Sequence, residues 1–275
     1  MFSSRPNKYY LSGIDWLISA FDYTMKKTTS SGNASQIVVE MDPPVDLKHL
    51  ESSIIEFTDN FPVLFGTVVR NKYNGAPYWR VARRGKNRLN IETHDVKGHS
   101  SAMDLMPVFE ESINTPFRDK NEHIAFRIIQ ADRKKTYLTM TFDHRLLDAH
   151  GAETFLDLLS CFVRDNSDRS VFQDIRLTAP PAMSAWKKRL HAGGNINRKF
   201  IDWSRTAFDS LSSGSGKKEG FRFTVCTFDA EETKAIYRSA ENDAGYLMGM
   251  AYLLAAVLQG MQNLFKNESS QNLFL

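Results

Sequence analysis

The stretch around Tyr137–Leu156 constrains the fold of this 275-residue chain more than any other. It begins with the β-favouring run 137–142 and passes into Asp143-His144-Arg145. Beyond the turn, apolar residues recur at helical spacing on one face: Phe155, Leu158, Leu159 and Phe162. This pattern predicts a strand, a turn and a helix in direct succession. Strand ends and tight turns are where a rigid scaffold presents reactive side chains.

The predicted turn carries His144 and, four positions later, Asp148. An imidazole titrates near neutral pH, so a histidine placed there can take a proton from a hydroxyl, an amine or a thiol. A nearby aspartate can fix the ring or hold the turn by pairing with an arginine. His144, Asp148 and His150 lie within seven residues on one turn and rarely converge as tetrahedral ligands, so we expect no metal site.

The chain before this motif alternates predicted strands with amphipathic helices. Strand composition marks 36–41, 63–69, 77–82, 89–93, 124–130 and 136–142, and the last two runs are joined by a short polar connection typical of a hairpin. Helices are predicted over 14–25, over 104–113 and after Asp46, which is a good N-cap for an apolar stripe through Leu47, Leu50, Ile54 and Phe57. This order indicates an α/β fold.

Composition changes in the second half of the chain. The linker-like runs 178–181 and 212–218 separate the motif region from a predicted strand, 221–228. Asp229 and Glu232 have the spacing of a capping box that opens a helix over 230–240. The uncharged stretch 245–265 contains three glycines and several amides, so we expect a buried core helix rather than a membrane span.

Overall composition excludes several classes of function. The formal net charge is +3 and the basic residues are dispersed, so we expect no nucleic-acid partner. The two cysteines lie far apart and provide neither a disulfide framework nor metal-ligand spacing. Together with the lack of an N-terminal apolar segment, this favours the reducing cytoplasm.

The motif resembles the HHxxxDG signature of CoA-dependent acyltransferases, which include chloramphenicol acetyltransferase, condensation domains and wax-ester synthases. It is most similar to the DHRxxDG variant of dihydrolipoyl acyltransferase cores. Asp143 stands where the first histidine usually is, His144 is the catalytic histidine, and Arg145 and Asp148 match the arginine and aspartate. The motif lies near the middle of the chain, which matches the two-lobed, condensation-type members rather than the single-lobed ones.

The resemblance implies a chloramphenicol-acetyltransferase-like lobe with a mixed, largely antiparallel sheet over residues 1–178. A connector over 179–220 and the beginning of a second, truncated lobe over 221–275 follow. The implied reaction transfers an acyl group from a CoA or carrier-protein thioester to a hydroxyl or amine of a small-molecule acceptor. His144 would act as general base, while Asp148 would mainly hold the turn. The thioester is a co-substrate, and no tightly bound cofactor is implied.

Two alternatives stay open at this point. Ala149 replaces the motif glycine, and a Cβ there would strain the turn if that position needed a positive φ. This substitution and the short second lobe favour a non-catalytic, condensation-like binding module or a fragment. The DHR triplet favours a dihydrolipoyl-type enzyme. An incomplete second lobe would leave apolar faces uncovered, which predicts self-association through residues 221–265.

Overall fold

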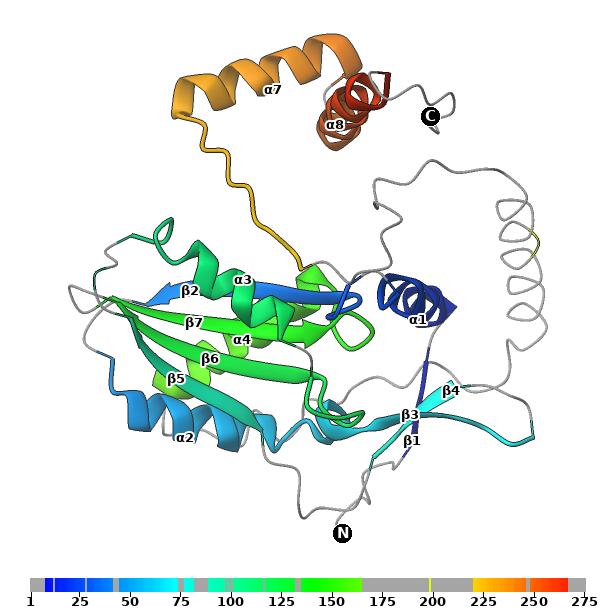
Figure 1. Ribbon diagram of the computed structural model, residues 1–275, viewed down its shortest axis with the longest axis vertical. Helices are drawn as coiled ribbons and strands as arrows, with labels where there is room; N and C mark the ends of the chain where they lie inside the picture. The colour runs from blue at the N-terminus through cyan, green and yellow to red at the C-terminus, as the bar shows by residue number, and fades with distance from the viewer. Residues whose placement is uncertain are drawn as a thin grey trace. The chain divides into compact units, whose positions relative to one another are not determined.

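The computed structural model describes residues 8–11, 13–27, 29–41, 45–73, 77–81, 89–96, 98, 101–115, 117–131, 135–164, 198, 220–245 and 248–266. The chain divides into two compact units (Figure 1). The first comprises Met1–His191 and Gly216–Arg222, and the second comprises Ala192–Ser215 and Phe223–Leu275. Nearly all of the predicted connector lies outside the described residues.

The first unit is built on a four-stranded sheet with the order β2-β7-β6-β5. Its strands are β2 (Ala34–Met41), β5 (Asn90–Val96), β6 (Ile124–Ala131) and β7 (Thr136–Asp143). Pairing is antiparallel between β2 and β7 and between β7 and β6, and it is parallel between β5 and β6. The prediction of a mixed, largely antiparallel sheet is confirmed.

Helices α2 (Leu47–Thr58) and α4 (Ala149–Arg164) cover one face of this sheet (Figure 1). Asp46 caps α2 as predicted, because its Oδ1 accepts hydrogen bonds from the amides of Lys48 and His49 at 3.0 and 3.1 Å. Alternate residues of the two central strands point into this core, including Ile124, Phe126, Ile128, Leu138, Met140 and Phe142. The stripe predicted from 155 to 162 also packs here, through Phe155, Leu159 and Phe162.

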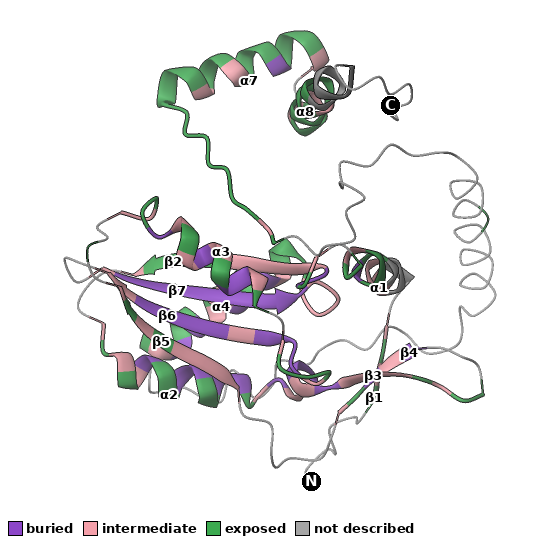
Figure 2. Cartoon of the chain, in the orientation of Figure 1, coloured by how far each residue is buried: buried purple, intermediate pink, exposed green. Residues whose placement is uncertain are grey.

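Helix α3 (Met106–Asn114) packs on the opposite face, where Leu105 and Phe109 meet Ile129 and Tyr137 in a second, smaller cluster. Every residue of β7 is buried (Figure 2). Strand alternation places Asp143 on this second face, away from the core of α2 and α4. The last residue of the central strand is therefore polar and enclosed.

A smaller antiparallel sheet contains β1 (Lys8–Tyr10), β4 (Pro77–Arg80) and β3 (Thr67–Arg70), in that order. The strand predicted over 63–69 is half wrong, because Pro62–Phe65 forms a 3₁₀ turn, η1, and only Thr67 begins the strand. Pro62 fixes its own φ at a helical value and lies at the start of that turn. Helix α1 (Gly13–Met25) connects to the chain before β2 through Asp22, whose Oδ1 accepts the Asn33 amide at 3.1 Å.

The second unit contains α7 (Ala230–Ala244) and α8 (Gly249–Lys266). The predicted capping box of α7 is present, with Asp229 and Glu232 each accepting the other's backbone amide. The strand predicted over 221–228 is wrong: a strand requires a neighbour, and no described strand pairs with this segment. The expected burial of α8 is also wrong, since most of its described side chains are exposed, including Met250, Leu254 and Val257. None of the helices in the described part of the chain is both long and apolar enough to span a bilayer.

Candidate active site

Asp143 organises the turn that the sequence singled out. Its backbone amide donates to the carbonyl of His123 at 2.9 Å, which closes the β6–β7 pairing. Its carbonyl accepts the amide of Leu146 at 2.8 Å, and its Oδ1 accepts the amide of Arg145 at 2.9 Å. Backbone and side chain of one residue thus fix both ends of the short turn that contains His144.

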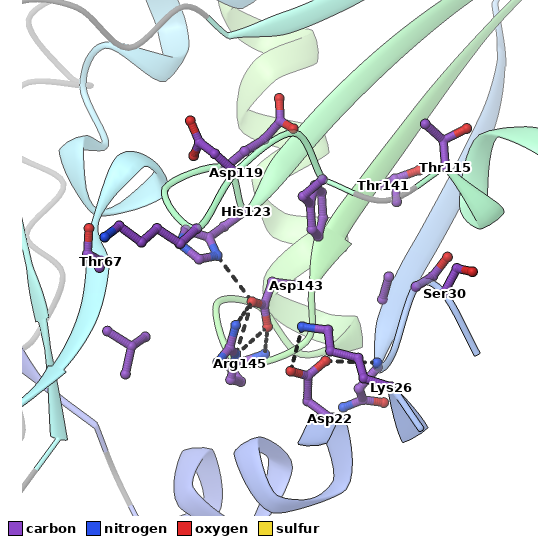
Figure 3. Close-up of a pocket in the computed structure, with 17 residues that line it drawn as sticks. Asp22, Lys26, Ser30, Thr67, Thr115, Asp119, His123, Thr141, Asp143 and Arg145 are labelled. Carbon is purple, nitrogen blue, oxygen red and sulfur yellow. Dashed lines mark hydrogen bonds and ion pairs between the residues drawn. The ribbon is translucent and has the colours of Figure 1, made fainter. Parts of the chain in front are cut away.

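Asp143 is 6 % exposed, and its carboxylate lies between the side chains of Arg145 and His123 (Figure 3). Arg145 donates from Nε to both carboxylate oxygens, at 2.9 and 3.0 Å, and from Nη2 to Oδ2. His123 approaches Oδ2 with Nδ1 at 3.1 Å. Burial alone would raise the pKa of Asp143, but the hydrogen bonds from Arg145 and His123 outweigh it and hold the pKa well below its usual range.

His123 is 4 % exposed, and both of its ring nitrogens contact acceptors. Nε2 lies 2.7 Å from the carbonyl oxygen of Gly66, which can only accept a hydrogen bond. Nδ1 faces the Asp143 carboxylate, so each ring nitrogen lies against a hydrogen-bond acceptor. Trp79 packs against it edge-on at 4.6 Å between centroids, and the guanidinium of Arg145 lies 5.9 Å from the Trp79 centroid.

His144 directly follows the last residue of β7, as the motif predicted. It is half-buried, and its Nδ1 is buried without a hydrogen-bond partner among the described residues. With the ring hydrogen on this Nδ1, Nε2 would be the nitrogen that accepts a proton from a substrate. A histidine held at a strand end with one nitrogen available has the chemistry of a general base.

Asp148 has a different partner from the one predicted. It is exposed, and no arginine among the described residues pairs with it. Its Oδ1 instead accepts the amide of Gly151 at 2.7 Å and so caps the first turn of α4. A Cβ on Gly151 would lie 3.0 Å from that oxygen, so the glycine allows this close approach. The prediction of a turn-holding role fits this geometry, but Asp143 rather than Asp148 binds the arginine.

Ala149 is the first residue of α4 and has a helical backbone. The strain expected from a positive φ at this position is therefore absent, because alanine is the residue best suited to a helix. Replacement of the motif glycine does not distort the turn in this protein.

A cavity of about 400 Å³ lies beside the turn (Figure 3). Asp143 and Arg145 line it, but His144 between them does not. Apart from Ala34, Val68 and Phe117, the other lining residues are polar or charged: Asp22, Lys26, Ser30, Ser31, Asn33, Thr67, Thr115, Asp119, Lys120, Glu122, His123 and Thr141. The cavity can therefore take a polar molecule, and its wall is fixed by the buried pairs of Asp143.

The described residues include no cluster of three histidine, cysteine, aspartate or glutamate side chains placed to hold a metal ion. His150 is exposed on the first turn of α4, apart from the buried charges.

No family model matches the sequence, and a search of curated proteins finds none similar to it. Solved structures do match. The first condensation domain of the calcium-dependent antibiotic synthetase, bound to a substrate analogue, is 14% identical with a TM-score of 0.50, over 70% of this chain and 44% of that one. The tallysomycin biosynthesis protein TlmII is 13% identical with a TM-score of 0.50, over 70% of this chain and 45% of that one.

This likeness shows the fold. The chain has the architecture of a condensation-domain lobe, as the resemblance of its motif predicted. It spans less than half the length of each of these two structures.

Proposed function

We propose that the protein is a condensation-type acyltransferase that moves an acyl group from a CoA or carrier-protein thioester to a hydroxyl or amine. The observation that carries this proposal is the placement of His144 in a motif-matched turn at the end of the central strand, on a condensation-type fold. The ring is half-buried, and its buried Nδ1 has no partner among the described residues.

In this mechanism His144 removes the proton of the acceptor as the acceptor attacks the thioester carbonyl. The C–S bond then breaks, and the imidazolium returns the proton to the leaving thiolate. No covalent enzyme intermediate forms. The base must be neutral before the reaction, so its hydrogen resides on the buried Nδ1 and Nε2 accepts the substrate proton.

An acceptor bound in the polar cavity would lie next to this turn, although His144 itself does not line the cavity. Asp143 and Arg145, the neighbours of His144 in the chain, both line it. Their buried ion pair is already satisfied, so an acceptor bound there meets a preorganised wall rather than mobile charges.

The test compares His144→Ala with His150→Ala in the full chain. His150 is exposed, belongs to the same segment and has no role in the proposal, so it is a matched control. The assay follows free-thiol release from a panel of acyl-CoA donors with hydroxyl and amine acceptors. His144→Ala should lower the rate about 10²–10⁴-fold, as for a lost general base, whereas His150→Ala should leave it unchanged.

Acyl transfer that survives His144→Ala at the wild-type rate would contradict this mechanism. A second candidate, a non-catalytic binding module, is favoured by the absence of His144 from the cavity lining. It would replace the enzyme hypothesis if no donor and acceptor gave His144-dependent turnover while the folded chain still bound an acyl-CoA.

A further inference from the structure

We infer that His123, which lies outside the motif, is a positioning residue that sets the orientation of His144 by holding Asp143. This inference rests on the proposed catalytic role of His144. His123 holds Asp143 at two points, by its carbonyl at 2.9 Å from the Asp143 amide and by its Nδ1 at 3.1 Å from the carboxylate. Asp143 cannot shift or rotate without breaking one of these contacts.

His123 is itself anchored on the side away from the turn. Its Nε2 donates to the carbonyl of Gly66 at 2.7 Å, at the junction between η1 and β3. A Cβ on Gly66 would lie 3.1 Å from the carbonyl oxygen of Val63 and 3.4 Å from the Trp79 ring, so only glycine fits this junction without displacing a neighbour. The imidazole therefore links the small sheet to the end of β7.

The position of Asp143 determines the position of the turn that contains His144. The Asp143 side chain accepts a hydrogen bond from the amide of Arg145, and its backbone carbonyl accepts one from the amide of Leu146. Asp143 therefore holds both peptide groups that follow His144 in the turn. A misplacement of about 1 Å in a catalytic group can lower the rate about 10²-fold. Loss of the His123–Asp143 contact should therefore impair turnover through the placement of His144.

Two amide substitutions separate this role from simple packing. In His123→Asn the side-chain amide can occupy the place of Nδ1 and keep a hydrogen bond to Asp143. In His123→Gln it can occupy the place of Nε2 and keep the bond to Gly66, leaving Asp143 without its partner. Both variants remove the ring from its edge-on contact with Trp79, so packing loss is shared between them.

His49 provides a matched control on the other face of the sheet. Its Nε2 lies 3.1 Å from the carbonyl oxygen of Val163, so His49→Gln makes the same change at a histidine that joins α2 to α4. Thiol release should fall about 10-fold to 10²-fold in kcat for His123→Gln, with KM nearly unchanged. The asparagine variant and His49→Gln should stay within about threefold of the wild type.

A second readout does not depend on turnover. In ¹⁵N-histidine-labelled protein, the ring signals of His144, assigned by their loss in His144→Ala, should move in His123→Gln and stay near their wild-type positions in His123→Asn. Folded His123→Gln with unchanged His144 signals and unchanged kcat would overturn the inference, as would equal losses in both variants. If His144→Ala retained full activity, the proposed function would fail, and the ring signals alone would still decide whether His123 positions His144.

Discussion

Replacing Asp143 by asparagine removes a buried negative charge that lies between Arg145 and His123, while keeping the size of the side chain. Loss of one partner from a buried ion pair costs about 3–5 kcal/mol, because the remaining charge is left uncompensated. We expect about 3 kcal/mol for Asp143→Asn, at the low end of that range. The reason is that Arg145 is partly exposed to water, which can solvate the charge left behind.

The lowered pKa of Asp143 determines how its contribution to the unfolding free energy changes with pH. The pKa of Asp143 is lowered in the folded state, so its stabilisation is fully present above the unfolded pKa of about 3.9. As the pH falls below that value, the Asp143 carboxylate takes up a proton in the unfolded chain but stays ionised in the folded protein. The difference in unfolding free energy between the wild type and Asp143→Asn should therefore stay constant from neutral pH down to about pH 5 and shrink as the pH falls through about 4 and below.

Urea unfolding of both proteins at neutral and acid pH measures this difference directly. Glu153→Gln, an exposed substitution on α4, controls for the loss of one negative charge. A loss for Asp143→Asn no larger than that of Glu153→Gln, or a difference that does not change with pH, would refute the buried ion-pair account.

Three further predictions concern the same segment and the second unit. Asp148→Ala should cost about 1 kcal/mol of stability through loss of the α4 cap, whereas Asp148→Asn should be nearly neutral because asparagine caps equally well. Thermal unfolding distinguishes the two variants, and equal losses of stability would contradict the capping role. Ala149→Gly should destabilise by up to about 1 kcal/mol in the same assay, and a gain would contradict the helical backbone at this position. The exposed apolar residues of α8 predict concentration-dependent self-association by light scattering, and a monomer at high concentration would argue against it.

The sequence alone predicted the helices and strands whose signals lie within a few residues of each other in the chain. Asp46 predicted the start of α2, and Asp229 with Glu232 predicted the start of α7. The motif predicted His144 at the end of a strand. The 3₁₀ turn at 62–65 was missed because its residues after Pro62 are apolar and β-favouring, and only packing beside Trp79 and Gly66 reveals its conformation. The segment 221–228 has strand composition but no described partner, and pairing is not a local property.

The role of His123 was missed although a signal for it exists. The predicted hairpin between 124–130 and 136–142 pairs Gln130 with Thr136 and Ile124 with Phe142. Continuing that register by one residue sets His123 opposite Asp143. The sequence pattern does not show which aspartate of the motif is buried. That depends on Trp79 and Gly66, which come from a different sheet and a preceding turn.

The pairing of β2 with β7 has a consequence for the order of folding. Gln36 and Thr141 bond across this pair although they lie 105 positions apart in the chain. At a synthesis rate of about 5–20 residues per second, β2 leaves the ribosome roughly 5–20 s before its partner. The β6–β7 hairpin joins neighbouring segments and should form quickly once it emerges, whereas closure of the longer loop is slower. During that interval β2 is an unpaired strand that a chaperone or a second nascent chain can bind.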